Sequence, residues 1–483
     1  MSTTPISLDL NNIQGDILSG LPKKTQYYIF FKIQDAAKFR SDLAHFIPLI
    51  KTVAQVLKDR DDIDDHKRRG QPGLIPLVGV NISISHFGFV KLGIDDSTLA
   101  PNGTEDVFVK GQKQDAITNL GDPKRADGNP DWEDAFLNEI DGLIIISGES
   151  HATIEKKKHE IEHIFGVHTH HASIQEVKSI RGDVRPGDQS GHEHFGFLDG
   201  ISNPTVNGFD TNVNPGPKSV DPGKVLVGQT GDPTPTREDW AKDGSFLVFR
   251  YLFQLVPEFD KFLEEHPLKK DGNGKDLTPE KGSELLGARM VGRWKSGAPI
   301  DVSPFQDDPE LADDPKRTND FKFEGERTSQ LKCPFAAHVR KTNPRDDLEP
   351  DFSIDDRRIL RRGVQFGPEV TRAEHNSGKT IHDRGLLFTC YQSHIENGFQ
   401  FLQQSWANTA NFPPFTGIGN ATGLDPLIGQ GDRAMSGLDP LSPQNVLPID
   451  TFIIPRGGEY FFSPSLKALK ENIATGVQFT VQA

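Results

Sequence analysis

The sequence predicts an α+β fold built from two related halves. With 483 residues, the chain is far longer than one typical domain, so two domains or one duplicated domain is the starting expectation. Strand-like segments alternate with amphipathic segments that are typical of helices. A glycine-led apolar strand that leads through a Ser-His pair into a helix occurs twice at the same spacing, at residues 142–151 and 385–394. We therefore expect two sheets covered by helices, divided near residue 185.

The individual elements follow from hydrophobic periodicity. Residues 27–33 alternate and are rich in β-branched and aromatic side chains, which predicts a strand. The amphipathic segment 35–46 then predicts a helix. The same pair recurs as a strand at 245–256 and a helix at 257–265. Glycine- and proline-rich stretches in the second half indicate surface loops.

Composition excludes several classes of protein. A net charge of -15 and a pI near 5.5 argue against nucleic acid as a partner, because phosphates need a basic surface. No apolar run is long enough to cross a membrane. The two cysteines, Cys333 and Cys390, form no CxxC pair, which excludes a disulfide framework and zinc-finger chemistry.

The amino terminus bears on the compartment. Residues 1–6 contain neither a basic nor an apolar region, so we expect no secretory signal in this chain. The compartment stays open between the cytoplasm, secretion without a recognisable signal, and the extracellular space for a processed form.

Residues 196–200, Gly-Phe-Leu-Asp-Gly, are the first candidate for chemistry. The glycines allow a tight turn and a close approach to a flat ligand. Apolar neighbours disfavour the charged form of Asp199, so we expect a carboxylate that accepts and returns a proton near neutral or acid pH. An ordinary Asp-Gly turn is the alternative reading of the same five residues.

Two further segments offer a ligand and a cation. His338 follows an apolar segment, and imidazole is the usual axial ligand of haem iron in peroxidases. Arg361 lies in an Arg-rich run beside two apolar residues, where a guanidinium could stabilise charge that develops on peroxide oxygen. A satisfied core histidine and an exposed basic surface are the simpler alternatives.

Together these segments resemble the dye-decolorizing peroxidase family, in particular its fungal members. The Gly-x-x-Asp-Gly motif of the family corresponds to residues 196–200 and continues as Ile-Ser-Asn-Pro at 201–204. Residues 12–18, Asn-Ile-Gln-Gly-Asp-Ile-Leu, are also typical. Further matches lie at residues 292–297, 338–345, 358–363 and 385–388. The resemblance spans most of the chain, and the order of its motifs is specific.

The resemblance implies the fold and the cofactor. It implies a duplicated ferredoxin-like fold with antiparallel sheets covered by helices, in which residues 1–185 form the N-terminal domain. Residues 186–483 would form the C-terminal domain and hold one haem b (iron protoporphyrin IX). His338 would be the proximal iron ligand, with Asp425 as the expected partner of its other ring nitrogen.

The resemblance also implies the distal pocket and the reaction. Ile201, Leu386 and Phe388 would shape the cofactor pocket. Asp199 would take a proton from bound H2O2 and return it to the leaving oxygen, while Arg361 stabilises the charge. Two one-electron steps would then oxidise small or bulky aromatic reductants such as phenols and dyes.

Electron transfer and Mn²⁺ give three further expectations. Dyes are too large for a pocket that admits peroxide, and the family is thought to pass electrons through surface aromatics. The resemblance therefore makes Trp406 the candidate surface electron relay, with ordinary helix packing as the alternative. Phe366 stands where some relatives carry a tyrosine, which removes one radical site. The acidic run that includes Asp347, Asp351 and Asp355 is a candidate Mn²⁺ site, with a solvated loop as the favoured alternative.

Two other classes of protein are weighed against the peroxidase. Residues 159–163, His-Glu-Ile-Glu-His, fit the zinc motif HExxH, with His168, His170 or His171 as the third ligand. Charged neighbours predict that this helix faces solvent, which argues against a zinc site in a cleft. A haem carrier without catalysis is the other alternative, and it would use His338 but not Asp199.

Overall fold

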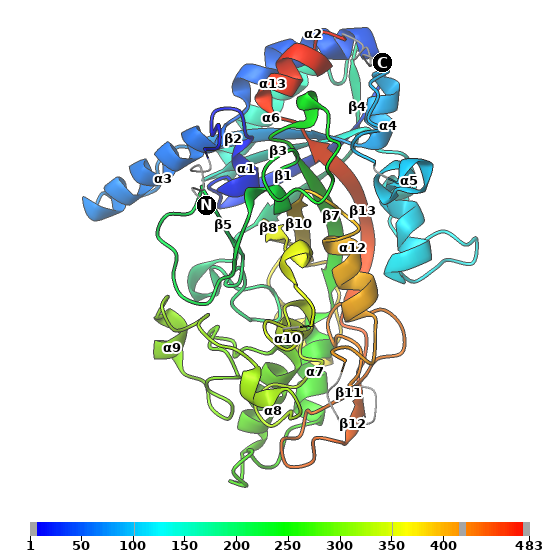
Figure 1. Cartoon of the computed structure of the whole chain (residues 1–483). Helices are drawn as coiled ribbons and strands as arrows, with labels where there is room; N and C mark the ends of the chain where they lie inside the picture. Colours follow the sequence, from blue (N-terminus) through cyan, green and yellow to red (C-terminus); the bar gives the residue numbers. More distant parts are fainter. Residues whose placement is uncertain (1–6, 101, 350, 415–421, 477–483) are drawn as a thin grey trace, which may run out of the picture.

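The computed structural model describes residues 7–476 apart from 101, 350 and 415–421. Its centre is one long antiparallel sheet in the order β4-β1-β3-β2-β13-β7-β10-β8, with β9 also paired to β10. Figure 1 shows the sheet running through both halves of the chain, with helices on its outer surfaces. Within the described residues, no helix is both long and apolar enough to cross a membrane.

The first half of the sheet comprises β1 (Thr25–Ile33), β2 (Val78–Ile84), β3 (Gly142–Gly148) and β4 (Ile174–Asp183). Numbered within this half, the strands have the spatial order 4-1-3-2. Strand β1 lies between β4 and β3 and pairs antiparallel with both. This order is that of the ferredoxin-like motif.

The second half repeats the arrangement. It contains β7 (Ser245–Gln254), β10 (Gly385–Gln392), β13 (Ile453–Ser463) and two short strands, β8 (Leu360–Arg361) and β9 (Val364–Phe366). If β8 and β9 count as one interrupted strand, the order is again 4-1-3-2, because β13 and β10 flank β7. The predicted duplicated α+β fold with antiparallel sheets is therefore confirmed.

The two halves join along the sheet and also meet at its far ends. Phe462 of β13 pairs with Ile84 of β2, which makes the sheet continuous. At the other end, a Cβ on Gly182 of β4 would stand 2.5 Å from the Val364 side chain of β9. The outer strands of the two halves thus approach each other closely, and the sheet curls toward a barrel.

Helices cover the sheet because their apolar sides match its surface. In the first half, α2 (Ala36–Phe46) and α6 (His151–Phe165) bury Phe39 and Phe165, whose rings stack at 5.6 Å. In the second, α7 (Val256–Glu265) and α8 (Pro279–Val291) pack in a separate core. The remaining helices are α1 (Gly15–Leu18), α3 (Val53–Arg68), α4 (His86–Lys91), α5 (Val107–Asp115), α9 (Pro309–Asp313), α10 (His338–Thr342), α11 (Arg372–Ser377), α12 (Phe399–Phe401) and α13 (Leu466–Ala468). Short strands outside the main sheet are β5 (Thr205–Val206), β6 (Ser219–Val220), β11 (Ala434–Ser436) and β12 (Val446–Pro448).

One predicted element differs from the structure. Ser150 caps α6, so the first Ser-His pair leads directly into a helix as predicted. After the second pair, at Ser393 and His394, the chain forms a turn, and α12 begins only at Phe399. The Gln392 side chain accepts a hydrogen bond from the Phe399 backbone N–H at 2.7 Å and so holds the start of the delayed helix.

Candidate active site

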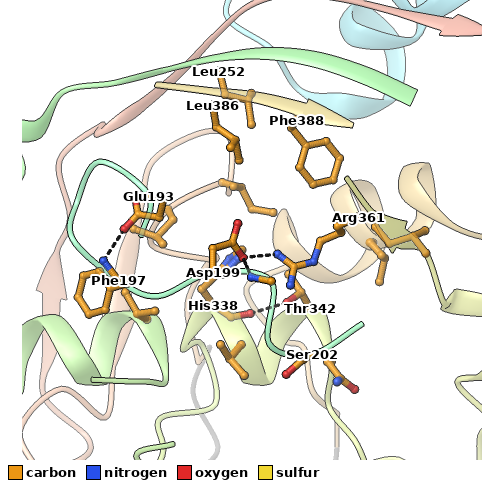
Figure 2. Close-up of a pocket in the computed structure, with 18 of the residues that line it drawn as sticks. Glu193, Phe197, Asp199, Ser202, Leu252, His338, Thr342, Arg361, Leu386 and Phe388 are labelled. Carbon is orange, nitrogen blue, oxygen red and sulfur yellow. Dashed lines mark hydrogen bonds and ion pairs between the residues drawn. The ribbon is translucent and has the colours of Figure 1, made fainter. Parts of the chain in front are cut away.

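A large cavity lies in the second half of the chain, beside β8 and β10. Its volume is about 1700 Å³ when the space at its mouth is included. The residues that line it begin at Glu193, so the first half contributes none of the described lining. Figure 2 shows Asp199 and Arg361 between His338 on one side and Leu386 and Phe388 on the other.

The loop that carries Asp199 is held from several sides. Gly196 and Gly200 adopt φ angles of +91° and +82°, which explains the two glycines that flank the motif. The Asp199 backbone N–H donates to Gly191. Beneath the loop, the Glu193 carboxylate accepts hydrogen bonds from the backbone N–H groups of Phe195 and Phe197, both at 2.9 Å. These hydrogen bonds hold the turn in place, and the turn presents the Asp199 carboxylate to the cavity.

Asp199 and Arg361 form an ion pair inside the cavity. Arg361 Nη1 lies 2.6 Å from Asp199 Oδ1, which also accepts the Gly200 backbone N–H. Burial raises the pKa of Asp199, but the charge and the hydrogen bond of Arg361 outweigh it and hold the pKa below its usual value. The expectation that apolar surroundings favour the neutral acid is therefore wrong. The ion pair with Arg361 favours the ionised form of Asp199.

Asn203 connects the Asp199 loop to the backbone of Arg361. Its Oδ1 accepts the Arg361 backbone N–H at 3.0 Å, and its Nδ2 donates to the Arg361 carbonyl at 3.3 Å. On its other side, Arg361 pairs with Cys390 of β10. The sequence contains Asn203 within the Ile-Ser-Asn-Pro segment, but pattern alone did not indicate this role.

His338 begins α10 and faces the cavity from the other side. Its Nδ1 lies 2.8 Å from Asp425 Oδ2. Burial lowers the pKa of His338, but the charge and hydrogen bond of Asp425 outweigh it and raise that pKa above its usual value. Asp425 is fully buried, and its other oxygen accepts the backbone N–H groups of Leu427 and Ile428. Since Nδ1 is bound, Nε2 is the nitrogen that can coordinate a metal in the cavity.

β10 and the Asp199 loop both contribute to the apolar walls of the cavity. Leu386 and Phe388 lie two residues apart on β10, so their side chains point to the same face of the sheet. Both line the cavity. Ile201, two residues after Asp199, lines it as well. The three predicted pocket residues thus surround the same space as the polar pair and His338.

The sequence analysis did not predict a cluster of arginines at the cavity. Arg293 and Arg358 line the cavity, and Arg345 binds the same Asn319 oxygen as Arg293. In the part of the chain that the structure describes, none of the three has a carboxylate within 4 Å. Burial and then neighbouring arginines lower the pKa of Arg293 to about 9. Such crowding of like charges favours an anionic group at this end of the cavity.

Trp406 does not lie at the surface. It is 3% exposed and belongs to a small apolar cluster behind the cavity wall. Its ring stacks on Phe412 at 4.9 Å and meets the Phe401 edge at 5.5 Å. The expectation of a surface tryptophan is therefore wrong, because Phe401, Phe412 and the other apolar side chains of this cluster bury the indole. Phe366 is also buried, in contact with Tyr251.

The acidic run does not form the expected cation site. Both oxygens of Asp347 are bound by Arg340, at 2.7 and 2.8 Å, and the pair is buried. Asp355 pairs with Lys218 at 2.8 Å, and Asp351 is exposed. The described residues contain no group of three or more His, Cys, Asp or Glu side chains arranged to hold a metal. Arginine and lysine partners thus take two of the three carboxylates expected to bind Mn²⁺.

The geometry also argues against a zinc site on α6. His159 and His163 are exposed on the outer surface of the helix, and His159 pairs with Glu162 at 2.9 Å. His168, His170 and His171 lie in an exposed turn. Within the described ranges, none of these histidines belongs to a group of three or more His, Cys, Asp or Glu side chains that could hold a metal.

Comparison with known families agrees with this site. The model of the "DyP dimeric alpha+beta barrel domain" matches residues 12–186, and that of "Dyp-type peroxidase, C-terminal" matches residues 192–413. A dye-decolorizing peroxidase of Mycena epipterygia is 44% identical over 96% of this chain and 86% of its own length. This chain belongs to the dye-decolorizing peroxidase family.

Solved structures of the family share the whole fold. An ancestral D-type dye-decolorizing peroxidase has a TM-score of 0.91 and 60% identity, covering 97% of this chain and all of its own. A dye-decolorizing peroxidase in complex with 2,6-dimethoxyphenol has a TM-score of 0.87 and 43% identity, covering 97% of this chain and 100% of its own. The chain is therefore a peroxidase of a family of haem enzymes, and the cavity is its candidate active site.

Proposed function

We propose that this enzyme binds one haem b in the cavity and uses H2O2 to oxidise phenols and bulky dyes by one-electron steps. A related enzyme has been solved with 2,6-dimethoxyphenol, which supports phenols as a substrate class. We also propose that residues 186–483 form the haem-binding domain and residues 1–185 its partner. The observation that carries the proposal is the placement of His338 opposite the Asp199–Arg361 pair across one apolar cavity.

The residues of the cavity fit haem in three respects. His338 offers Nε2 to the iron while Asp425 binds Nδ1 and raises the basicity of the ring. Leu386, Phe388 and Ile201 suit the flat apolar faces of a porphyrin. Arg293 and Arg358, with no carboxylate partner among the described residues, suit the propionates.

The polar pair would manage the proton. When bound, haem would supply the redox chemistry that reduces peroxide and then oxidises the reductant. The Asp199 carboxylate would accept the proton from one oxygen of H2O2 and deliver it to the other oxygen, which leaves as water. The guanidinium of Arg361 would donate hydrogen bonds to the negative charge that develops on the leaving oxygen. The lowered pKa of Asp199 keeps the carboxylate ionised, and so available to accept the proton.

Trp406 would carry electrons from bulky reductants that do not fit the cavity. Leu402, four residues before it, lines the cavity wall, so the indole lies just behind that wall. Beyond it, Phe401 stacks at 6.5 Å on Phe352, which is 38% exposed. The indole, which is far easier to oxidise than a phenylalanine ring, would be the relay itself, and Phe401 and Phe352 connect its position to the surface by packing.

Haem titration of the apoprotein tests the proposal. We expect one haem per chain, a Soret band, and a spectral change after one equivalent of H2O2. His338→Ala should empty or loosen the site, whereas His382→Ala, which removes an exposed histidine, should bind haem normally. Haem binding without peroxide turnover would identify a carrier instead, and full haem occupancy in His338→Ala would reject the ligand assignment.

A further inference from the structure

Arg362, the neighbour of Arg361, reaches into the opposite half of the molecule. Its Nε donates to the carbonyl of Asp16 at 3.1 Å, and its Nη2 donates to those of Ile17 at 3.3 Å and Leu18. These carbonyls belong to the end of α1, where a helix leaves acceptors without helical partners. A guanidinium suits this position because it carries several donors and a positive charge.

The chain after α1 closes around the same side chain. Gly20 has a φ of +74°, and a Cβ there would stand 3.0 Å from Arg362 Cδ. Lys23 donates a hydrogen bond to the Arg362 carbonyl. The Arg362 backbone N–H donates to Thr389 of β10 at 2.8 Å. Arg362 is therefore bound through its side chain, its carbonyl and its N–H.

Helix α1 is itself fastened to β10, the strand that pairs with Arg361. The buried Asp16 carboxylate accepts the Leu21 backbone N–H and the Tyr391 hydroxyl, both at 3.0 Å. Tyr391 follows Cys390, which pairs with Arg361. The connections form a closed ring from α1 through Arg362 to β8, across to β10, and back through Tyr391 to Asp16.

We propose that Arg362 is a positioning residue, through which the first half of the chain sets the place of Arg361 in the cavity. Arg362 Nη1 also donates to the Arg361 carbonyl at 3.1 Å, so its guanidinium acts directly on the peptide that joins the two residues. The first half lines no described part of the cavity, yet it would control the geometry of the Asp199–Arg361 pair. This inference rests on the proposed function, because its readout needs bound haem.

Fluoride binding to the ferric holoenzyme provides a readout that is separate from turnover. Fluoride is a small anion that needs a hydrogen-bond donor above the iron, a role that Arg361 would fill. Arg362→Met keeps much of the side-chain volume but removes every donor, and we expect fluoride affinity to fall about tenfold. Arg362→Lys restores charge and donors, so its affinity should lie within about threefold of the original.

A matched control and a double-mutant cycle separate positioning from general damage. Arg60 donates to the carbonyls of Ser19 and Gly20 in the same segment, but among the described residues it makes no hydrogen bond to Arg361 or Arg362. Arg60→Met should therefore change fluoride affinity by less than about twofold. In an Arg361→Leu background, Arg362→Met should have no further effect beyond about twofold, because Arg362 acts through Arg361.

Two results would overturn the inference. One is an unchanged fluoride affinity in Arg362→Met. The other is a loss of fluoride affinity that is as large when Arg362→Met is added to Arg361→Leu as when it is made alone. Should Arg362→Met fail to fold, Arg362→Gln takes its place with the same expected direction, because glutamine cannot reach all three carbonyls. If the wild-type chain fails to bind haem, the proposed function is overturned as well. If the wild-type holoenzyme is active and Arg362→Met binds fluoride with the original affinity, only this inference is overturned.

Discussion

The Nδ1 atom of His338 lies 2.8 Å from Oδ2 of Asp425, and the second oxygen of that carboxylate is bound by two backbone N–H groups. An ionised carboxylate has no proton to donate, so Asp425 accepts the hydrogen bond and Nδ1 of His338 carries the hydrogen. Asp425 therefore determines both the tautomer and the orientation of the proposed iron ligand.

We expect Asp425→Asn to weaken haem retention by about 10–100-fold, because the amide removes the charge that makes the His338 ring basic. Transfer of haem from the holoenzyme to an apo-globin measures this loss. Asp432→Asn, an exposed acid on the same loop, is the control and should retain haem normally. Equal rates of haem transfer from both variants would contradict the role of Asp425.

Replacing Asp199 by asparagine should slow the reaction with H2O2 by about 10²–10⁴-fold, because the group that accepts and returns the proton is lost. Stopped-flow mixing with peroxide measures the rate, and the Soret spectrum shows that haem remains bound. Asp188→Asn, an exposed acid in the segment before the motif, should react like the original enzyme. Unchanged peroxide kinetics in Asp199→Asn would reject its assignment as acid-base catalyst.

The Arg361–Asp199 pair predicts a pH dependence with a definite sign. If Asp199 is the proton acceptor, its carboxylate form is the active one. Because its pKa is lowered, the peroxide reaction should be lost only as pH falls below the usual range of an aspartate pKa. Arg361→Leu removes the charge and the hydrogen bond that lower the pKa of Asp199. Burial, which raises that pKa, remains, so the acid limb of the kcat/KM profile should move to higher pH. The measurement is the pH profile of kcat/KM for Arg361→Leu and for the control Arg372→Leu, which changes an exposed arginine. An unmoved acid limb in Arg361→Leu would show that another group controls it.

Because Trp406 is buried and stacked on Phe412, phenylalanine is a better replacement than a small residue. Trp406→Phe should lower turnover of bulky dyes about tenfold while small phenols lose much less, because phenylalanine is far harder to oxidise. Trp240→Phe alters a buried tryptophan in a different core and serves as the control. Equal loss for dyes and phenols in Trp406→Phe would argue against a relay.

Local patterns predicted several elements of the fold. Alternation predicted the strand over residues 27–33, which the structure extends to Thr25, and the repeated glycine-led strands indicated the duplication. The capped helix after Ser150 follows from a serine whose hydroxyl accepts the Thr153 N–H. Its counterpart after Ser393 could not be predicted, because a contact between Gln392 and Phe399 delays the helix.

The candidate site divides in the same way. The order of the motifs predicted that Asp199, His338, Arg361 and Asp425 belong together, and the structure brings the first three to one cavity with Asp425 behind His338. Their electrostatics could not be predicted from neighbours in sequence. Asp199 is 162 residues from the arginine that lowers its pKa.

By itself, the sequence determined the duplicated α+β fold, the family and the residue types available for chemistry, because these depend on periodicity and on ordered motifs. Only the tertiary structure decided that Asp199 is paired with Arg361, that Asp347 is bound to Arg340, and that Trp406 is buried. It also brought Arg362 to the end of α1. Charge, burial and hydrogen bonding depend on distances in space. Several of these contacts join residues that are far apart in the sequence, so the order of the residues does not reveal the distances.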